Sequence, residues 1–122
     1  MSSPKTIFCD LDGTLTKHPG PEFSTVLQDP DHRLELLPGV KEFLMKIDKE
    51  RYHLVITTGR KESGREATVK QLQKAGILYD QLIMGFGGGD RILINDRKEG
   101  SDRDTAFAIN VTRNGGVSNL KI

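Results

Sequence analysis

Two aspartates separated by one residue follow a short apolar run near the start of the chain. The run is Ile7-Phe8-Cys9, and Asp10, Asp12 and Gly13 come directly after it. Two carboxylates at a separation of ~4 Å repel each other by about 4 kcal/mol when the effective dielectric constant is near 20. A divalent cation relieves that repulsion, and a site of carboxylate, carbonyl and water oxygens suits Mg²⁺. Gly13 permits the sharp backbone bend that would turn the chain back toward such an ion.

Three predicted strands would deliver polar residues to one edge of a sheet. The apolar run before Asp10 is typical of a buried strand. Tyr52–Thr57 predicts a second strand that leads into Thr58, and Arg91–Asn95 predicts a fourth strand that leads into Asp96. In open parallel sheets, ligands bind outside the carboxyl ends of the strands. We therefore expect Asp10, Thr58 and Asp96 to converge.

Two helices are predicted between these strands. The first begins after Pro38-Gly39, and its apolar residues recur at helical spacing. These residues are Val40, Phe43, Leu44 and Ile47. The second helix is expected from about Gly64 to Ala75, with Val69 and Leu72 facing inward. Because strand and helix alternate through the middle of the chain, the sequence predicts an α/β fold with a parallel sheet.

Further patterns define the ends of the second helix and two more strands. Ser63 and Glu66 have the spacing of a capping box at its start, and Gly76 is well placed to end it. Gln81–Met84 contains a short third strand, and Thr105–Val111 has the alternation of a half-buried strand. These patterns add elements on the carboxyl-terminal side of the predicted sheet.

Length and composition predict a single domain spanning residues 1–122. The 18 basic and 17 acidic side chains leave a net charge of +1, which gives no case for nucleic acid or an anionic membrane as an obligate partner. Cys9 is the one cysteine, so an internal disulfide framework is excluded and a cytoplasmic location is favoured. We expect no secretory segment before the first strand, and no apolar run approaches the roughly 18 residues of a membrane span.

The stretch Asp-Leu-Asp-Gly-Thr-Leu-Thr after an apolar strand resembles the first motif of the haloacid dehalogenase (HAD) superfamily of phosphohydrolases. The resemblance implies that Asp10 attacks phosphorus and that Asp12 acts as general acid and base. Ile-Thr-Thr-Gly-Arg resembles the second motif, which implies that Thr58 and Gly59 bind phosphate oxygens. Leu-Ile-Asn-Asp resembles the fourth motif, which implies that Asp96 binds Mg²⁺ together with Asp10 and Asp12. The implied fold is a Rossmann-like three-layer sandwich with a mostly parallel central sheet.

The third motif of the family is where the sequence departs from the pattern. Related proteins place a lysine or arginine near the start of the fourth strand, where it neutralises the phosphorylated aspartate. The loop Gly85–Gly87 has no lysine. Arg91 is the nearest cation and our first candidate for this phosphate-binding role, with Arg60, Lys61 and Lys98 as rivals.

The spacing of the motifs leaves no room for the separate cap domain that the family often inserts. The polar stretch Thr16–Leu37 is a long loop that we expect at the rim of the site, and it is too short for a cap. A small capless protein has an open site, which suits a phosphorylated small molecule, a bulky phosphorylated substrate, or closure by a partner in a homo-oligomer. The stretch from Gly59 to Asp80 also resembles phosphatase domains that act on polynucleotide ends.

The resemblance therefore implies a Mg²⁺-dependent phosphomonoester hydrolase that works through an aspartyl-phosphate on Asp10. One alternative is a catalytically weak or inactive module that binds phosphorylated ligands, since the lysine of the third motif is missing. Another is a receiver domain, but its phosphoacceptor aspartate would end the third strand, where this chain has Met84-Gly85. Cys9 alternates with Asp10 along the strand, so we expect it in the core and not as a nucleophile.

Overall fold

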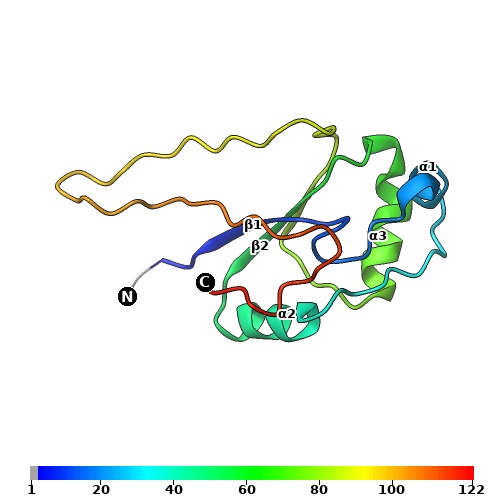
Figure 1. Ribbon diagram of the computed structural model, residues 1–122, viewed down its shortest axis with the longest axis horizontal. Coiled ribbons are helices and arrows are strands. Elements are labelled where there is room, and N and C mark those ends of the chain that lie inside the picture. The colour runs from blue at the N-terminus through cyan, green and yellow to red at the C-terminus, as the bar shows by residue number, and fades with distance from the viewer. Residues whose placement is uncertain (1–2) are drawn as a thin grey trace.

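The computed structural model describes residues 3–122 of the chain as an α/β protein (Figure 1). In chain order its elements are β1 (Thr6–Asp10), the 3₁₀ turn η1 (Gly20–Glu22), α1 (Phe23–Leu27), α2 (Val40–Lys49), β2 (His53–Thr57), the 3₁₀ turn η2 (Glu62–Gly64), α3 (Arg65–Lys74) and β3 (Gln81–Ile83). The strands form one parallel sheet in the order β1-β2-β3. The predicted α/β class and parallel sheet are therefore confirmed. Among the described residues, no helix has the length and apolar character needed to cross a bilayer.

Both of the longer helices pack on the same face of this sheet. The register places Cys9 beside Ile56 and Ile56 beside Leu82, so their side chains share that face. These side chains belong to one hydrophobic core with α2 and with Leu72 of α3. On the opposite face, Phe8 remains 57% exposed. Two right-handed crossovers that advance in the same direction leave both helices on one side. The buried core of the described residues therefore lies between this face of the sheet and the helices α2 and α3.

Helix α2 forms where the apolar spacing predicts it. Val40, Phe43 and Ile47 are buried, and Leu44 lies at the edge of the core. The helix begins after Gly39, whose φ is +77°. A Cβ atom at Gly39 would lie 2.6 Å from the backbone of Ser118, so this position requires glycine for its conformation and for the close approach of the chain.

Helix α3 has a buried face that differs from the predicted one. Leu72 is buried as expected, but Val69 is 36% exposed. The polar side chains of Thr68 and Gln71 are buried instead, and both of them accept hydrogen bonds from Arg60. A pattern based on hydrophobicity cannot anticipate this inversion, because it arises from the need to satisfy a buried guanidinium group.

Of the two ends predicted for α3, only the carboxyl-terminal one is confirmed. The capping box of Ser63 and Glu66 is not formed, because η2 leads directly into the helix and no side chain bonds the cap position Gly64. Gly64 instead packs against Leu27, and a Cβ atom there would lie 2.9 Å from the Leu27 Cγ. At the other end, Gly76 has a φ of +73° directly after the helix, as predicted.

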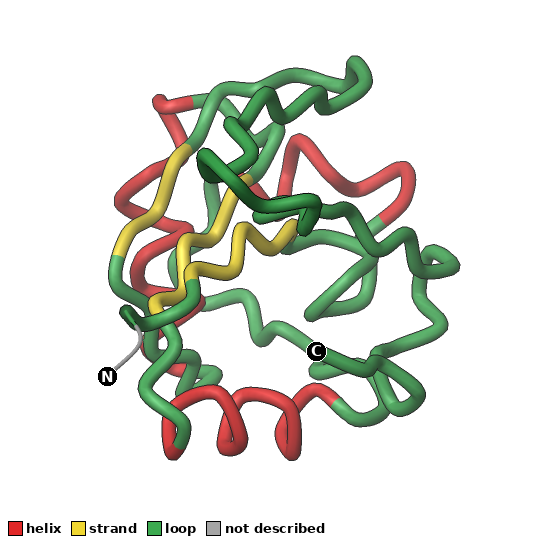
Figure 2. Tube along the Cα trace, turned by 90° about the vertical axis from the view of Figure 1, so that its left-hand side faces the viewer, coloured by secondary structure: helices red, strands yellow, loops and turns green. Residues whose placement is uncertain are grey.

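Residues 90–112, called the arm from here on, run out from the sheet and back without forming a helix or strand (Figures 1 and 2). The strands predicted at Arg91–Asn95 and Thr105–Val111 both lie in the arm and are therefore wrong. The Asn95 side chain donates to the Thr105 hydroxyl at 2.7 Å, which links the outgoing and returning halves. Ile94 is 90% exposed. The apolar pattern of a strand is present here, but no neighbouring strand pairs with it.

Cys9 lies in the core of the sheet, as predicted. Burial, with a smaller contribution from the charge of Asp10, raises the pKa of its thiol to about 12. The reactive thiolate is therefore scarce at mildly alkaline pH. We expect an aromatic disulfide reagent to modify no thiol in the native protein at about pH 8 and to modify one thiol per chain after unfolding in guanidinium chloride. Rapid stoichiometric labelling of the native protein would show that β1 opens readily.

Candidate active site

A tight turn after β1 fixes the positions of the two motif aspartates. The N–H groups of Thr14, Leu15 and Thr16 all donate to the Leu11 carbonyl, at distances of 3.0 to 3.2 Å. Gly13 has a φ of +89°, and its N–H donates to the Thr16 carbonyl at 2.7 Å. The sharp bend predicted at Gly13 is thus confirmed.

Asp10 at the end of β1 has no cationic side chain in direct contact within the described residues. Its carboxylate accepts a hydrogen bond from the Thr14 hydroxyl at 3.1 Å. Desolvation by the surrounding protein raises the pKa of Asp10 above its ordinary value. The Asp12 charge adds to this rise, whereas the Thr14 bond and the more distant Arg91 charge oppose it. The positive charge near the carboxylate is therefore too weak to offset its desolvation.

Asp12 is held in a very different environment, by a bidentate ion pair with Arg60. The Arg60 Nη2 and Nε atoms donate to the two carboxylate oxygens of Asp12 at 2.8 and 2.9 Å. The side chain of Arg60 is fully buried, and that of Asp12 is 7% exposed. A planar guanidinium fork fixes the plane of the carboxylate that it binds. Asp12 thus has a single orientation and is almost completely buried.

Thr58 and Gly59 lie at the end of β2, next to β1, as predicted. Thr57 pairs with Asp10 in the sheet, and Thr58 follows it. Thr58 is buried, and its hydroxyl oxygen accepts the backbone N–H of Arg60 at 3.1 Å. A Cβ atom at Gly59 would lie 2.6 Å from the Gly87 carbonyl oxygen, so only glycine fits there. The two loops at this end of the sheet are therefore in close contact.

The candidate cations for phosphate are placed differently from one another. Arg91 donates to the Gly87 carbonyl at 3.0 Å and also to the Gly89 carbonyl, and it lies 5.2 Å from the centre of the Phe86 ring. Its charge lowers the pKa of Asp10, so the two groups interact electrostatically. Arg60 is already committed to Asp12. The role of Arg91 toward phosphate stays a prediction.

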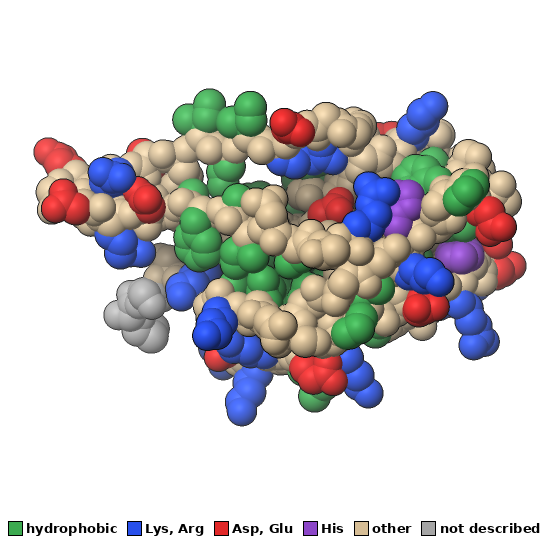
Figure 3. Space-filling model, in the orientation of Figure 1, with side chains coloured by type: hydrophobic (Ala, Val, Ile, Leu, Met, Phe, Trp, Pro, Cys, Tyr) green, Lys and Arg blue, Asp and Glu red, His purple; other side chains and the backbone are tan. Residues whose placement is uncertain are grey.

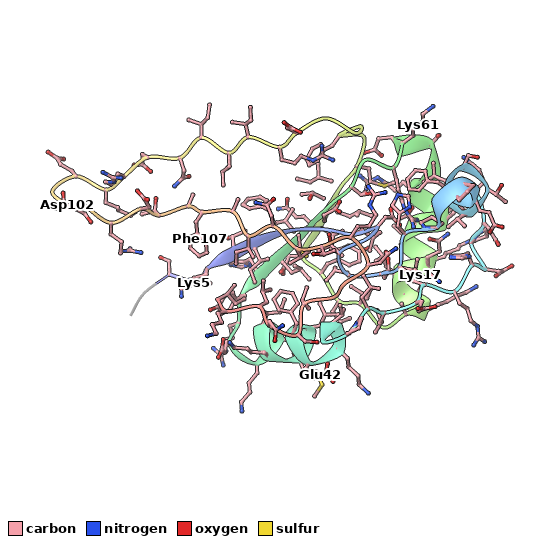
Figure 4. The ribbon with its side chains drawn as sticks, viewed as in Figure 1. Lys5, Lys17, Glu42, Lys61, Asp102 and Phe107 are labelled. Atoms are coloured by element: carbon pink, nitrogen blue, oxygen red, sulfur yellow. The ribbon has the colours of Figure 1, made fainter. Side chains whose placement is uncertain are left out.

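The two lysine rivals of Arg91 do not lie in the turn after β1. Lys61 is exposed and directly precedes η2, and Lys98 is exposed in the arm. Figure 4 labels Lys61 on the outer side of the molecule. Neither lysine is among the charges that influence Asp10.

The predicted meeting of Asp96 with the other two aspartates is not found. Asp96 lies in the arm, where its backbone carbonyl accepts the Thr105 hydroxyl at 2.6 Å. Within residues 3–122, no three acidic, histidine or cysteine side chains form a group that could hold a metal ion. The arm extends away from the body as far as Asp102, which Figure 4 labels. Asp96 remains on the arm because residues 91–95 do not pair beside β1.

A carboxyl-terminal turn contacts the motif loop, which the sequence did not indicate. The Asn114 N–H donates to the Gly13 carbonyl at 2.8 Å, and the Asn114 side-chain oxygen accepts the His18 N–H at 2.8 Å. The Arg113 side chain packs over Gly13, where a Cβ atom would lie 3.1 Å from its Cγ. Figure 3 shows basic, acidic and histidine side chains gathered beside a hollow under the arm. These contacts join residues about 100 positions apart, so no local sequence pattern could have predicted them.

Comparison with known proteins defines the fold class. A chain in the structure of the Pnkp1/Rnl/Hen1 complex is 31% identical with a TM-score of 0.58, over 75% of this chain and 31% of that one. A chain of the Pnkp1/Rnl/Hen1 RNA repair complex is 27% identical with a TM-score of 0.56, over 84% and 28%. This chain thus spans less than a third of either. No family model and no curated protein matches the sequence.

A third similar structure agrees on the fold alone. A Vibrio cholerae protein is 23% identical with a TM-score of 0.52, and the match covers 75% of this chain and 79% of that one. Together with the parallel sheet, these likenesses define a small α/β protein with a Rossmann-type fold.

Proposed function

We propose that this chain is a capless, HAD-type phosphatase that hydrolyses phosphomonoesters through an aspartyl-phosphate on Asp10. The observation that carries the proposal is the contrast between the two motif carboxylates. Asp10 has no ion-pair partner among the described side chains, whereas Asp12 is clamped by a buried arginine. Two neighbouring carboxyl groups in different environments are suited to different roles, one as nucleophile and the other as proton carrier.

In the proposed reaction, an Asp10 carboxylate oxygen attacks phosphorus and the bond from phosphorus to the leaving oxygen breaks. The protonated form of Asp12, in equilibrium with the carboxylate that Arg60 holds, donates its proton to that leaving oxygen, which departs as an alcohol. Asp12 then takes a proton from a water molecule that hydrolyses the aspartyl-phosphate, so inorganic phosphate is released and both carboxyl groups return to their starting states. The fixed orientation of Asp12 supports both proton transfers, because each needs the same carboxylate to face the reacting oxygen.

The residues at the tip of β1 fit Mg²⁺ because they offer only oxygen donors, and because no cationic side chain among the described residues pairs directly with Asp10. We propose that the Asp10 carboxylate and the Asp12 backbone carbonyl would hold the ion. Bound there, Mg²⁺ would offset the repulsion between the Asp10 carboxylate and the phosphate. Thr58, Gly59 and Arg91 are proposed to bind the phosphate oxygens. Asp96 lies in the arm, apart from this group of donors, so it is not proposed as a ligand.

The proposal is tested by hydrolysis of an aryl phosphate with Mg²⁺ and with a chelator. We expect turnover with Mg²⁺ to fall at least about 100-fold on chelation and to return when Mg²⁺ is restored, because the ion supplies several kcal/mol of charge stabilisation. Asp102→Asn, at the far end of the arm, is the matched acidic control and should keep this behaviour. Turnover that is unaffected by the chelator, or no turnover with any phosphomonoester, would contradict the proposal.

A second candidate substrate is a phosphorylated polynucleotide end. Its support is the likeness to chains in the Pnkp1/Rnl/Hen1 structures, one of which is described as an RNA repair complex, together with the sequence resemblance over residues 59–80. A panel of sugar phosphates, nucleotides and 3′-phosphorylated oligonucleotides would distinguish the candidates. A higher kcat/KM for the oligonucleotides would favour polynucleotide ends, and equal values across the panel would favour a general phosphatase.

A further inference from the structure

A chain of buried hydrogen bonds connects the Asp12 carboxylate to the turn that follows α1. We propose that Arg60 and Gln71 are positioning residues, which set the orientation of Asp12 and couple it to that turn. The part of this inference that concerns catalysis rests on the proposed function of Asp12. The physical coupling itself does not, and it can be tested without any substrate.

The first part of this connection runs from Asp12 into helix α3. Besides its two bonds to Asp12, the Arg60 guanidinium donates through Nη1 to the Gln71 side-chain oxygen at 2.7 Å and to the Thr68 hydroxyl at 3.0 Å. The side chains of Thr68 and Gln71 are both buried. A buried guanidinium whose donors point to fixed acceptors on a helix has one permitted position. The orientation of Asp12 is therefore determined by α3 through the Arg60 guanidinium.

The second part runs from helix α3 to the turn after α1. The Gln71 side-chain nitrogen donates to the backbone carbonyls of Val26 and Asp29, both at 2.7 Å. The opposite orientation of this amide would point its NH₂ group at the Arg60 donors and its oxygen at two carbonyls, so the hydrogen bonds select one orientation. The Gln71 amide is thus bonded to the turn through its nitrogen and to Arg60 through its oxygen.

The turn belongs to the polar stretch that forms the predicted rim of the site. Residues 26–29 include the end of α1, and they are held to α3 through the side chain of Gln71. A displacement of this turn by about one ångström would break both amide bonds, because hydrogen bonds weaken steeply beyond their usual length. Arg60 would then lose its fixed acceptor, and the Asp12 carboxylate would lose its single orientation. The position of residues 26–29 and the orientation of the Asp12 carboxylate are therefore coupled.

Gln71→Met tests the connection, with Gln73→Met as its matched control. Gln73 lies on the same helix, and its side chain is exposed. The two substrates are an alkyl phosphate, whose leaving oxygen needs a proton, and an aryl phosphate, whose leaving group departs readily without one. For Gln71→Met we expect kcat on the alkyl phosphate to fall about 10- to 100-fold, with a smaller fall for release of the aryl alcohol and a KM close to that of the parent. A Gln71→Met variant with parental kcat on the alkyl phosphate, or the same losses in Gln73→Met, would overturn the inference.

Two further variants separate the halves of the connection. Gln71→Glu keeps an acceptor for Arg60 but removes the donors to the turn, so we expect an intermediate loss on the alkyl phosphate. Arg60→Lys removes the bidentate fork and should lose as much as Gln71→Met. Arg65→Lys is its control, because Arg65 holds Glu62 in a bidentate pair at the surface, far from Asp12 in the bonding network. An Arg60→Lys variant with parental kcat on the alkyl phosphate would overturn the role of the fork.

A spectroscopic measurement distinguishes failure of this inference from failure of the proposed function. In ¹⁵N and ¹³C spectra we expect the Arg60 Nε–H and Asp12 carboxyl resonances to shift in Gln71→Met and to stay in place in Gln73→Met. If those shifts occur but the parent hydrolyses no phosphomonoester, the coupling holds and the proposed function fails. Unchanged resonances in Gln71→Met would refute the coupling whatever the activity.

Discussion

The Asp10→Asn variant is expected to turn over phosphomonoesters at least about 1,000-fold more slowly than the parent chain, because an amide oxygen cannot replace a carboxylate nucleophile. The fold should be preserved, since the Thr14 hydroxyl, which donates to Asp10 at 3.1 Å, can donate equally well to an amide oxygen. Steady-state hydrolysis of an aryl phosphate with Mg²⁺ measures the loss. A variant that retains a tenth or more of the parental kcat would eliminate Asp10 as the nucleophile.

Although Asp10→Asn should lower turnover, we expect it to raise the stability of the fold in the absence of divalent cations. Burial raises the pKa of Asp10, so the folded state binds this proton more tightly than the unfolded state does. Its stabilising contribution is complete below the unfolded pKa and is lost as the pH rises through the folded pKa. Asn carries no charge, so the variant should be more stable than the parent at neutral pH and nearly equal to it at about pH 3. Urea unfolding at both pH values checks the sign.

Asp12→Ala is expected to lower the free energy of unfolding by about 3–5 kcal/mol, in contrast to Asp10→Asn. The change leaves the fully buried Arg60 guanidinium without its carboxylate partner, and an uncompensated buried charge carries this penalty. Denaturant unfolding at neutral pH measures the difference. Two carboxylates of one motif would then change stability in opposite directions, because only one of them has a buried cation as its partner.

The control for Asp12→Ala is Glu62→Ala, which removes another bidentate carboxylate partner of an arginine. Arg65 and Glu62 form their ion pair at the surface, where water replaces the lost contacts. We expect little change in unfolding free energy for this variant. Similar losses in both variants would mean that the Asp12–Arg60 pair is hydrated in solution, and no measurable loss in either would remove the argument that Arg60 is fixed by burial.

Local sequence patterns predicted the elements that depend on local physics. The spacing of Phe43 and Ile47 identified α2, and the apolar run before Asp10 identified β1. The arm was not predictable in this way, because Ile94 and its neighbours have the composition of a strand but no partner strand. Sheet pairing is decided by contacts between distant segments, so a strand-like sequence predicts only that a strand is compatible with it.

The site was predictable to the extent that strand ends determine it. Asp10 and Thr58 were expected at neighbouring strand ends and lie there. The pairing of Asp12 with Arg60 spans 48 positions in the sequence, and Arg60 was expected only as a candidate for phosphate. Gln71 carried no signal, since a glutamine on a helix is usually solvated. Hydrogen bonds between buried polar side chains can be assigned only when the packing around them is known.

The position of β1 at the outside of the sheet has a consequence for the composition of the site. On the side away from β2, its backbone N–H and C=O groups have no partner strand within the described residues. Such an edge can accept an extended peptide as an additional strand, although a length of five residues limits indiscriminate pairing. A strand added in parallel would end beside Asp10. A strand that pairs with this edge of β1 would therefore place its own side chains next to the candidate active site.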